Sequence, residues 1–541
     1  MPEALARRRQ GDDVRAPAAD PRRAAALQRV LERRLWGPLE EGEFSLEMID
    51  GELPVGLRGR LLMNGPGRLG GAGERSAWRD EHWLDGDGLL TAIRFGDAQE
   101  TDDNAGAEAS GRRPVTLTQR LVRTRRLEEE LEAGEPLFRR FGTSWPGDRL
   151  LRGVGIVSPA NVSVARLGAR LVACGEQGLP WEVDGQTLRT VGPFDAGGAL
   201  TPVTPFAAHL CRDPESGESF AFGVSFSPRQ PLLNLYRFDA GGELASRHRI
   251  ELPYPASIHD FALSHDFVVF HVSPYCLDMQ RLRAGASIEA SLDWRPELGS
   301  RLLVARRDDA AVVAQAPCGS GYCLHLANAF EPEPGRLVVD LVEYEAPLYP
   351  AYRLPRLYDG VPRGVPVRYV LDLERSPTAG LERSELPTSG WAPDFPSVLA
   401  SRETRSGSPA WMVDQPRTGG TSFFDRLVRV DWDAGETSEY RPQSGYLFAG
   451  EPAVVEGPQG PWVLAVVHRE PELAALAGTD GEDSPTGPDP RPAQPDTQLW
   501  VHDAMALEHG PLARLALPSV PPRFHALYEP RPGDRSGAAS A

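Results

Sequence analysis

The sequence predicts an all-β fold, and a propeller more than a single sandwich or barrel. From about residue 43 onward, short apolar or alternating runs recur, and each run ends at Gly, Pro, Asp or Asn, which is the pattern of strands separated by turns. The 55 glycines and 51 prolines suit that many turns, while long helical periodicity is scarce. So many short strands in a chain of 541 residues are typical of radially repeated sheets, although no tight blade repeat is visible.

The individual elements are assigned in chain order from these runs. We expect strands within residues 57–66, 89–97, 162–176, 218–228, 233–244, 266–275, 300–308, 336–344, 425–436, 461–469 and 497–508. The clearest helical candidate is RRLEEELEAGEPLFRRFG, residues 125–142. Two stretches rich in Gly, Asp and Pro, residues 100–114 and 476–498, are interpreted as mobile surface loops.

The chain divides into two parts of unequal size. Residues 1–42 are expected to form an N-terminal extension, in which residues 1–23 are mainly Arg, Ala, Pro and Asp and are predicted to be disordered. Residues 24–37 have helical spacing and predict a short helix there. Residues 43–541 are predicted to form a single propeller domain.

Composition excludes several classes of protein. The formal net charge is −18 and no lysine occurs, so the surface is a poor match for a nucleic-acid backbone. Five cysteines without a CxxC pair argue against a disulfide framework and against a thiolate zinc site. No signal peptide and no run of about 18 apolar residues is visible. The sequence therefore predicts a cytoplasmic protein, with no obligate protein partner evident.

Four histidines lie at the edges of predicted strands in apolar surroundings: His209, His259, His325 and His525. They are too far apart in the chain for one helix or hairpin to gather them. In a propeller, however, the innermost strand of each blade faces the axis, so one histidine from each of four blades could meet there. Neutral imidazole is a ligand for Fe, Zn, Cu or Ni. By spacing alone, buried histidines of the core remain the commoner explanation.

The residues around these histidines resemble the carotenoid cleavage oxygenase family. SIHDFALS (257–264) is similar to its Ser-Met-x-His-Asp-Phe-Ala segment, and HWLDGDGLLTAIRF (82–95) to its His-Trp-Phe-Asp-Gly-Asp-Gly stretch. CGEQGLPWEVDGQTLRTVG (174–192) and VPPRFHALY are also similar to segments of the family. One departure is Met63, where the family usually has Arg before Asn-Gly-Pro.

This resemblance implies the architecture and the metal. The expected fold is a seven-bladed β-propeller with a helical and loop dome over the top face. The four histidines would bind Fe(2+). Three carboxylates would support these ligands through hydrogen bonds: Glu176, Glu451 and Asp394, the last standing where the family has Glu and being one methylene shorter. Asp260 follows a ligand directly and is expected to point to the other side of the strand, where it makes hydrogen bonds and does not ligate.

The implied function is that of a non-haem Fe(II) dioxygenase. It would cleave a conjugated C=C bond of a carotenoid or apocarotenoid, an apolar polyene, with O2 to give aldehyde or ketone products. Because such a substrate dissolves in membranes, reversible peripheral membrane contact is expected.

Other functions remain open. A stilbenoid-cleaving dioxygenase is less favoured, because the Tyr and Lys that stilbene-cleaving relatives use to hold and deprotonate a hydroxyl correspond to Leu117 and Arg126, and Arg is a poor general base. An iron-dependent polyene isomerase on the same site is a further alternative. A propeller that lost catalysis and a zinc hydrolase are the remaining rivals.

Overall fold

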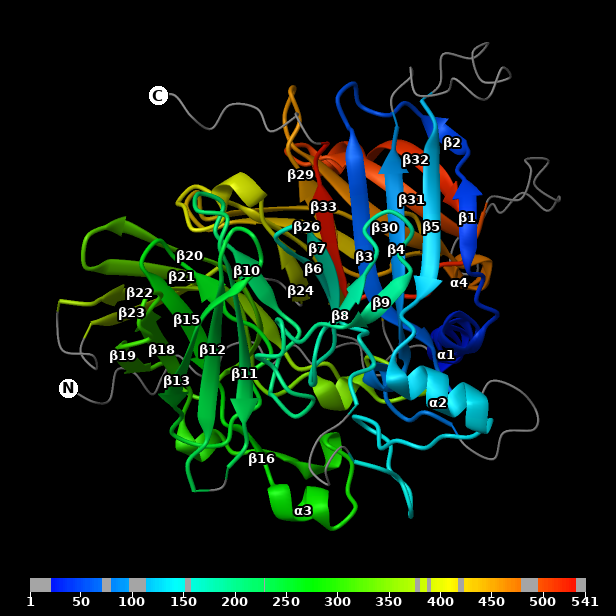
Figure 1. The fold of residues 1–541 in the computed structure, drawn as a ribbon. Coiled ribbons are helices and arrows are strands. Elements are labelled where there is room, and N and C mark those ends of the chain that lie inside the picture. The colour runs from blue at the N-terminus through cyan, green and yellow to red at the C-terminus, as the bar shows by residue number, and fades with distance from the viewer. Residues whose placement is uncertain are drawn as a thin grey trace.

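The computed structural model describes residues 21–70, 79–96, 113–150, 157–227, 229–374, 380–386, 391–416, 423–477 and 495–531. Seven sheets of four to six strands are arranged radially around a central axis, and one further two-stranded ribbon lies outside them (Figure 1). The predicted seven-bladed β-propeller is therefore confirmed. Most of the two predicted loops, residues 100–114 and 476–498, and nearly all of the segment predicted to be disordered lie outside the described residues.

Five blades are antiparallel meanders or nearly so. The first consists of β6 (Ser163–Leu167), β7 (Arg170–Cys174), β8 (Trp181–Val183) and β9 (Thr190–Pro193), and the second of β10 (Leu210–Arg212), β11 (Ser219–Ser225), β12 (Leu232–Phe238) and β13 (Leu244–Glu251). The third consists of β14 (Ala262–Leu263), β15 (Phe267–Val272), β18 (Arg301–Arg306) and β19 (Val312–Pro317), and the fourth of β20 (Tyr322–Glu333), β21 (Arg336–Tyr344), β22 (Gly364–Asp372) and β23 (Leu381–Glu385). The fifth consists of β24 (Trp391–Ser397), β25 (Ala410–Pro416), β26 (Arg426–Asp431) and β27 (Glu436–Tyr440).

Two blades combine strands from both ends of the chain and so close the ring. In one, the order is β1 (Gly42–Ser45), β5 (Val115–Leu121), β4 (Asp87–Phe95), β3 (Gly59–Arg68) and β33 (His525–Glu529). In the other, β2 (Met48–Gly51) pairs with β32 (Pro511–Leu517), followed by β31 (Thr497–Asp503), β30 (Trp462–Arg469) and β28 (Tyr446–Phe448), with β29 (Ala453–Val455) also on β30. Because the ring is closed, every blade lies between two other blades, and this arrangement protects the edges of the sheets.

Helices, turns and the ribbon gather at one end of the axis and form the predicted dome, at the bottom of Figure 1. They include α2 (Arg125–Ala133), α3 (Met279–Arg283) and the ribbon of β16 (Tyr275–Leu277) with β17 (Leu292–Trp294). Short 3-10 turns connect the elements: η1 Trp83–Asp85, η2 Glu289–Ser291, η3 Pro296–Leu298, η4 Tyr349–Tyr352, η5 Ala400–Arg402 and η6 Leu507–His509.

The helix predicted over residues 125–142 is shorter in the structure. It begins after Thr124, whose side chain accepts a hydrogen bond from the Leu127 N–H, and it ends at Gly134. Gly134 has a φ of 71° and its N–H donates to the Glu130 carbonyl, the usual end of a helix in a left-handed residue. The apolar spacing beyond this glycine belongs to residues that fold back onto the helix, since the N–H groups of Leu137 and Phe138 donate to the Glu130 side chain.

The N-terminal helix is part of the packed structure. The predicted helix 24–37 is observed as α1, Pro21–Trp36, and its apolar face is buried in the main core. It packs on α4 (Pro471–Ala477), and both Arg33 and Arg34 contact the completely buried carboxylate of Glu470, at 2.5 and 2.8 Å. In addition to the strand pairing of the two closing blades, these ion pairs connect the N-terminal helix to the C-terminal part of the chain.

Replacing Arg34 tests how strongly this helix is held. Arg34 is 8% exposed, and an Arg34→Ala variant leaves the buried Glu470 with one partner instead of two, so we expect a loss of about 3 kcal/mol in the free energy of unfolding. Arg29→Ala is the matched control on the same helix: Arg29 is 61% exposed in its pair with Glu472, and the expected loss is under about 1 kcal/mol. Urea unfolding monitored by fluorescence measures both, and equal losses would contradict the prediction.

Candidate metal centre

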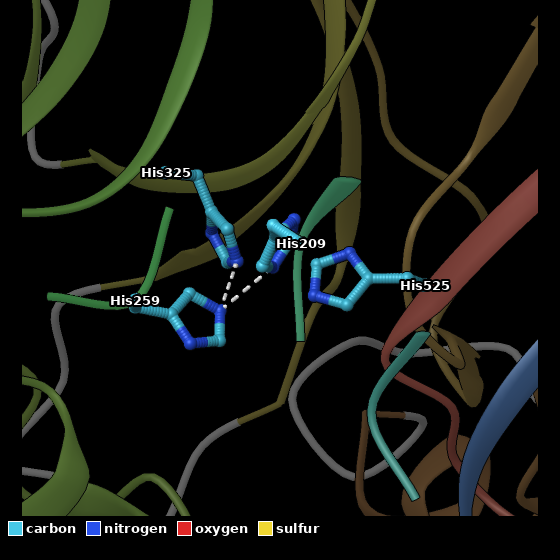
Figure 2. Close-up of side chains that lie close together, drawn as sticks. All are labelled: His209, His259, His325 and His525. Atoms are coloured by element: carbon cyan, nitrogen blue, oxygen red, sulfur yellow. Dashed lines mark hydrogen bonds between the residues drawn. The ribbon is translucent and has the colours of Figure 1, made fainter. Parts of the chain in front are cut away.

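The four histidines meet at the axis of the propeller, each from a different blade (Figure 2). His209 immediately precedes β10, His259 lies just before β14, His325 lies within β20 and His525 begins β33. One ring nitrogen from each lies within 4.8 Å of those of the other three. The Nε2 atom of His259 is 3.0 Å from that of His209 and 3.1 Å from that of His325. Four nitrogen donors this close are the arrangement of a metal site.

Local irregularities of the inner strands aim these rings at the axis. The pairing of β20 with β21 shifts register between Cys323 and Leu326, and His325 lies in this bulge, a feature that redirects a side chain. His525 is fixed differently, because its strand pairs with β3 and places it opposite Asn64. The predicted convergence of the histidines thus arises from strand ends and a bulge on the inner edges of the blades.

The three predicted supporting carboxylates all face ligand rings. Glu176 Oε1 is 2.5 Å from His259 Nδ1, and Asp394 Oδ1 is 2.6 Å from His325 Nδ1. Glu451 Oε2 is 3.5 Å from His525 Nδ1 and accepts the Ala526 N–H at 2.5 Å. Carboxylates placed this way fix the ring orientation of a metal ligand and raise its basicity.

Asp394 reaches its histidine directly although it is shorter than the usual Glu. The strand pairing of β24 with β25 shifts register between Asp394 and Ser397, and Phe395 within this bulge has a φ of 58°. The Asp394 carboxylate also accepts the Phe395 N–H at 2.8 Å. We infer that the bulge moves the backbone toward the axis and so compensates for the missing methylene.

Asp260 gives the cluster a fourth carboxylate that the sequence analysis did not assign. As expected, it makes a hydrogen bond, since its Oδ2 accepts the Leu326 N–H at 2.8 Å. Its Oδ1, however, lies 3.3 Å from Nδ1 of His209. Alternation along an ideal strand suggested that Asp260 points away from the site, but His209 comes from the neighbouring blade and meets it there. Each of the four imidazoles therefore has its own carboxylate.

Burial and the neighbouring imidazoles lower the pKa of two rings of the cluster. Burial, followed by the three neighbouring imidazoles, holds the pKa of His209 well below its ordinary value. Burial also lowers the pKa of His525, with the opposing effect of Glu451 too weak to reverse it. Both rings are consequently neutral near pH 7, and a neutral imidazole is the form that binds a metal.

A tyrosine completes the surroundings of His259. The hydroxyl of Tyr349, in η4, donates to Glu176 Oε2 at 3.2 Å and lies 3.4 Å from His259 Nδ1. The Tyr349 side chain is buried, and its ring packs edge-on against the ring of Phe141, with 5.0 Å between the two ring centroids. No sequence signal identified Tyr349, because its segment connects two strands and carries no motif.

A small cavity adjoins this side of the cluster. Its apolar wall is formed by Leu84, Phe141, Pro159 and Ile288, and Glu176 connects it to the histidines. Leu117, proposed above as the counterpart of a substrate-binding tyrosine, is instead packed in the core between blades, with 0% exposure.

Comparisons with known proteins agree with this fold and site. A family model described as retinal pigment epithelial membrane protein matches residues 37–530, and the chain belongs to this family, which includes the carotenoid cleavage oxygenases. The chain is 28% identical over 462 residues to the apocarotenoid-15,15'-oxygenase of Synechocystis sp., covering 80% of this chain and 86% of that protein. It is 27% identical over 492 residues to the isoeugenol monooxygenase of Pseudomonas putida, covering 89% and 93%.

The fold is also similar to solved structures of one of these relatives. A variant of the Synechocystis apocarotenoid oxygenase superposes with a TM-score of 0.76 at 23% identity, covering 93% of this chain and 99% of that one. The resemblance found in the sequence is thus confirmed, and the named relatives are oxygenases, as the enzyme class predicted from the sequence requires.

Replacing Asp260 tests whether the fourth carboxylate supports metal binding. An Asp260→Asn variant retains an oxygen for the Leu326 N–H but loses the negative charge beside His209. We expect the affinity for Co(II), followed by its visible absorption, to fall by about 10- to 100-fold with one ion per chain still bound. Asp340→Asn is the control, because this buried carboxylate lies in β21 of another blade, where it pairs with Arg368. Unchanged cobalt affinity in the Asp260 variant would show that the contact is incidental.

Proposed function

We propose that this protein is a non-haem Fe(II) dioxygenase that cleaves a conjugated C=C bond and releases two carbonyl products. The observation that carries the proposal is the convergence of His209, His259, His325 and His525 on one point. Imidazole suits Fe(II), and an all-histidine set with a carboxylate behind every ring fits a divalent cation. When bound, the iron would supply the activation of O2 for attack on the double bond.

The protein's own residues position the substrate and exclude water. Glu176, Asp394, Glu451 and Asp260 hold the four rings in place through their Nδ1 atoms. Apolar and aromatic side chains line the adjoining cavity, so an alkene loses its water shell as it enters. Holding a reactant beside the centre in this way is the main contribution that a protein makes to such chemistry.

A carotenoid or apocarotenoid is the proposed substrate. The named relatives act on an apocarotenoid in one case and on isoeugenol, an aromatic alkene, in another. The first supports a polyene, and the second keeps the stilbenoid alternative, which is also an aromatic alkene, in consideration. An isomerase on the same iron site would convert a polyene without consuming O2.

Oxygen consumption and product analysis test the proposed reaction. Protein loaded anaerobically with Fe(II) should consume O2 when given carotenoids, apocarotenoids or stilbenes, and mass spectrometry should find the paired carbonyl fragments. His325→Ala removes one proposed ligand and should lower the rate by more than about 100-fold. His265→Ala, at a side chain that is 72% exposed, should leave it unchanged.

Either of two results would contradict the proposal. Turnover without O2 uptake would favour the isomerase. Full activity in the His325→Ala variant would remove the metal centre from the reaction.

We further propose that the enzyme works in the cytoplasm and touches membranes transiently to collect its substrate. None of the helices in the described part of the chain is long and apolar enough to cross a membrane. Leu131 supports a peripheral contact, because it is 45% exposed on α2, the dome helix whose Arg126 lines the cavity.

Flotation with liposomes tests this contact. Leu131→Glu should reduce the fraction of protein that floats with neutral phospholipid vesicles several-fold, because it puts a charge at the proposed contact. Val312→Glu is the control: Val312 is 42% exposed on β19, away from the dome (Figure 1). No flotation of the wild type, or equal losses in both variants, would argue against membrane contact at α2.

A further inference from the structure

The end of the propeller axis opposite the dome is crossed by a segment that the proposed reaction does not use. We call residues 398–405, which include η5 and lie between β24 and β25, the crossbar. Its yellow ribbon lies at the top of Figure 1, whereas the dome lies at the bottom. The turn between β10 and β11 lies at the same end as the crossbar (Figure 1).

Three blades other than its own hold the crossbar. Arg405 pairs with Glu215, in the turn between β10 and β11, at 2.5 Å. Asn328 of β20 donates to the Arg405 carbonyl at 3.0 Å. On the other side, Ser401 donates to Glu456, which follows β29. Since these contacts reach the second and fourth blades and the blade of β29, the crossbar passes over the axis.

The backbone of the crossbar is strained and is held in place from outside. Thr404 has a φ of 66°, a left-handed conformation that is unfavourable for a β-branched residue. Its N–H donates to Asn328 Oδ1 at 3.0 Å, so β20 holds it there. The next tether, between Arg405 and Glu215, is 45% and 55% exposed, and exposed ion pairs are weak. Such a segment opens more easily than a packed strand.

On the inner side of the crossbar, a thiol lies one step along the axis from the metal ligands. Cys211 follows His209 by two residues, so the two side chains share a face of the strand. The Cys211 Sγ donates at 3.3 Å to the carbonyl of Phe261, which follows His259 by two residues. Both chains run from their histidine toward the crossbar end, and Cys211 is therefore between the histidines and the crossbar.

Glu403 of the crossbar lies near this thiol. Burial raises the pKa of the Cys211 thiol, and the carboxylates of Asp260 and then Glu403 raise it further, which places both carboxylates close to it. Within the described part of the chain, the Glu403 carboxylate makes no hydrogen bond or ion pair. Burial raises the pKa of Glu403 to about 7, against the opposing effect of Arg212. A carboxylate without a fixed partner is available to a passing cation.

The metal centre is most exposed at the histidine that leads to the crossbar. The His209 side chain is 15% exposed, compared with 8% or less for the other three histidines. His209 does not belong to the wall of the cavity on the dome side. Cys211 and Glu403 are half-buried as well. Accessible polar surface thus continues from the cluster toward the crossbar.

We propose that the metal ion reaches the four histidines along the axis from the end opposite the dome, and that the crossbar controls how fast it enters and leaves. The inference rests on the metal centre of the proposed function and not on its reaction. Glu403 attracts the cation at the crossbar, and Cys211 and Asp260 offer it sulfur and oxygen atoms on the way to the imidazoles. The metal and the substrate then use opposite ends of the axis.

Stopped-flow binding of Co(II) to the full-length apoprotein tests the proposal without turnover. Visible absorption measures uptake and a competing chelator measures release, at pH 8, where the Glu403 carboxylate is mostly ionised. Glu403→Gln should lower both rates by about threefold or more, because it removes the charge that draws the cation. Arg405→Gln should raise both rates about twofold to fivefold, because it frees the crossbar from Glu215. Since a route acts on both directions, the dissociation constant should change by less than about twofold.

The opposite signs distinguish a route from a general loss of structure, which would speed metal exchange in both variants. Glu403→Asp keeps the charge and should restore most of the wild-type rate of uptake. Arg306→Gln is the control: Arg306 is 50% exposed in its ion pair with Asp309, in the connection between β18 and β19, and its loss should leave both rates unchanged.

Rates equal to the wild type in both crossbar variants, or changes of the same sign, would overturn the proposal. Circular dichroism checks the fold of each variant. If Arg405→Gln does not fold, the comparison of Glu403→Gln with Glu403→Asp decides, and equal rates of uptake in these two would overturn the proposal.

These outcomes separate this inference from the proposed function. If one Co(II) binds per chain at rates that the crossbar variants do not change, the route is wrong and the dioxygenase stands. If the variants change metal exchange as expected but no alkene supports O2 uptake by the iron-loaded protein, the route stands and the proposed reaction is wrong.

Discussion

Closure of the ring is the constraint on which the rest of this structure depends. The pairing of β33 with β3 places His525 opposite Asn64 and brings the last histidine to the other three. The Asn64 side chain is completely buried, and it donates to the carbonyls of Ala160 and Ser163 in the adjoining blade. The same contact therefore closes the propeller and assembles the four-histidine cluster, so the stability of the fold and the integrity of the site are linked.

Electrostatic balance explains why such a cluster is compatible with a buried axis. An imidazole that binds a metal is neutral, whereas the four carboxylates behind the rings would be an unfavourable concentration of negative charge without a cation. Burial accordingly raises the pKa of Asp260. Burial would by itself lower the pKa of His325, but the Asp394 carboxylate raises it, and the net change is a rise. A divalent cation at the centre would offset this negative charge, so the carboxylates and the proposed metal stabilise one another.

The dome contributes what the blades do not. The blades supply the histidines and their carboxylates, while Tyr349 and the wall of the cavity, including Phe141 and Arg126, come from the segments that connect or cover them. A rigid propeller with variable covering segments is suited to retaining one chemistry while the substrate changes. The named relatives, which act on different alkenes, are consistent with this division.

Much of the fold and the candidate site could be predicted from the sequence, because strand patterns and the segments around the histidines are local signals. The resemblance in these segments also indicated Glu176, Asp394 and Glu451. The helix predicted over residues 125–142 was longer than the observed one, because local periodicity did not reveal that the chain turns back at Gly134. Only the tertiary structure decided the partners of Asp260, Tyr349 and Arg126. These contacts join residues from different blades and connections, and no short-range pattern encodes a distance between them.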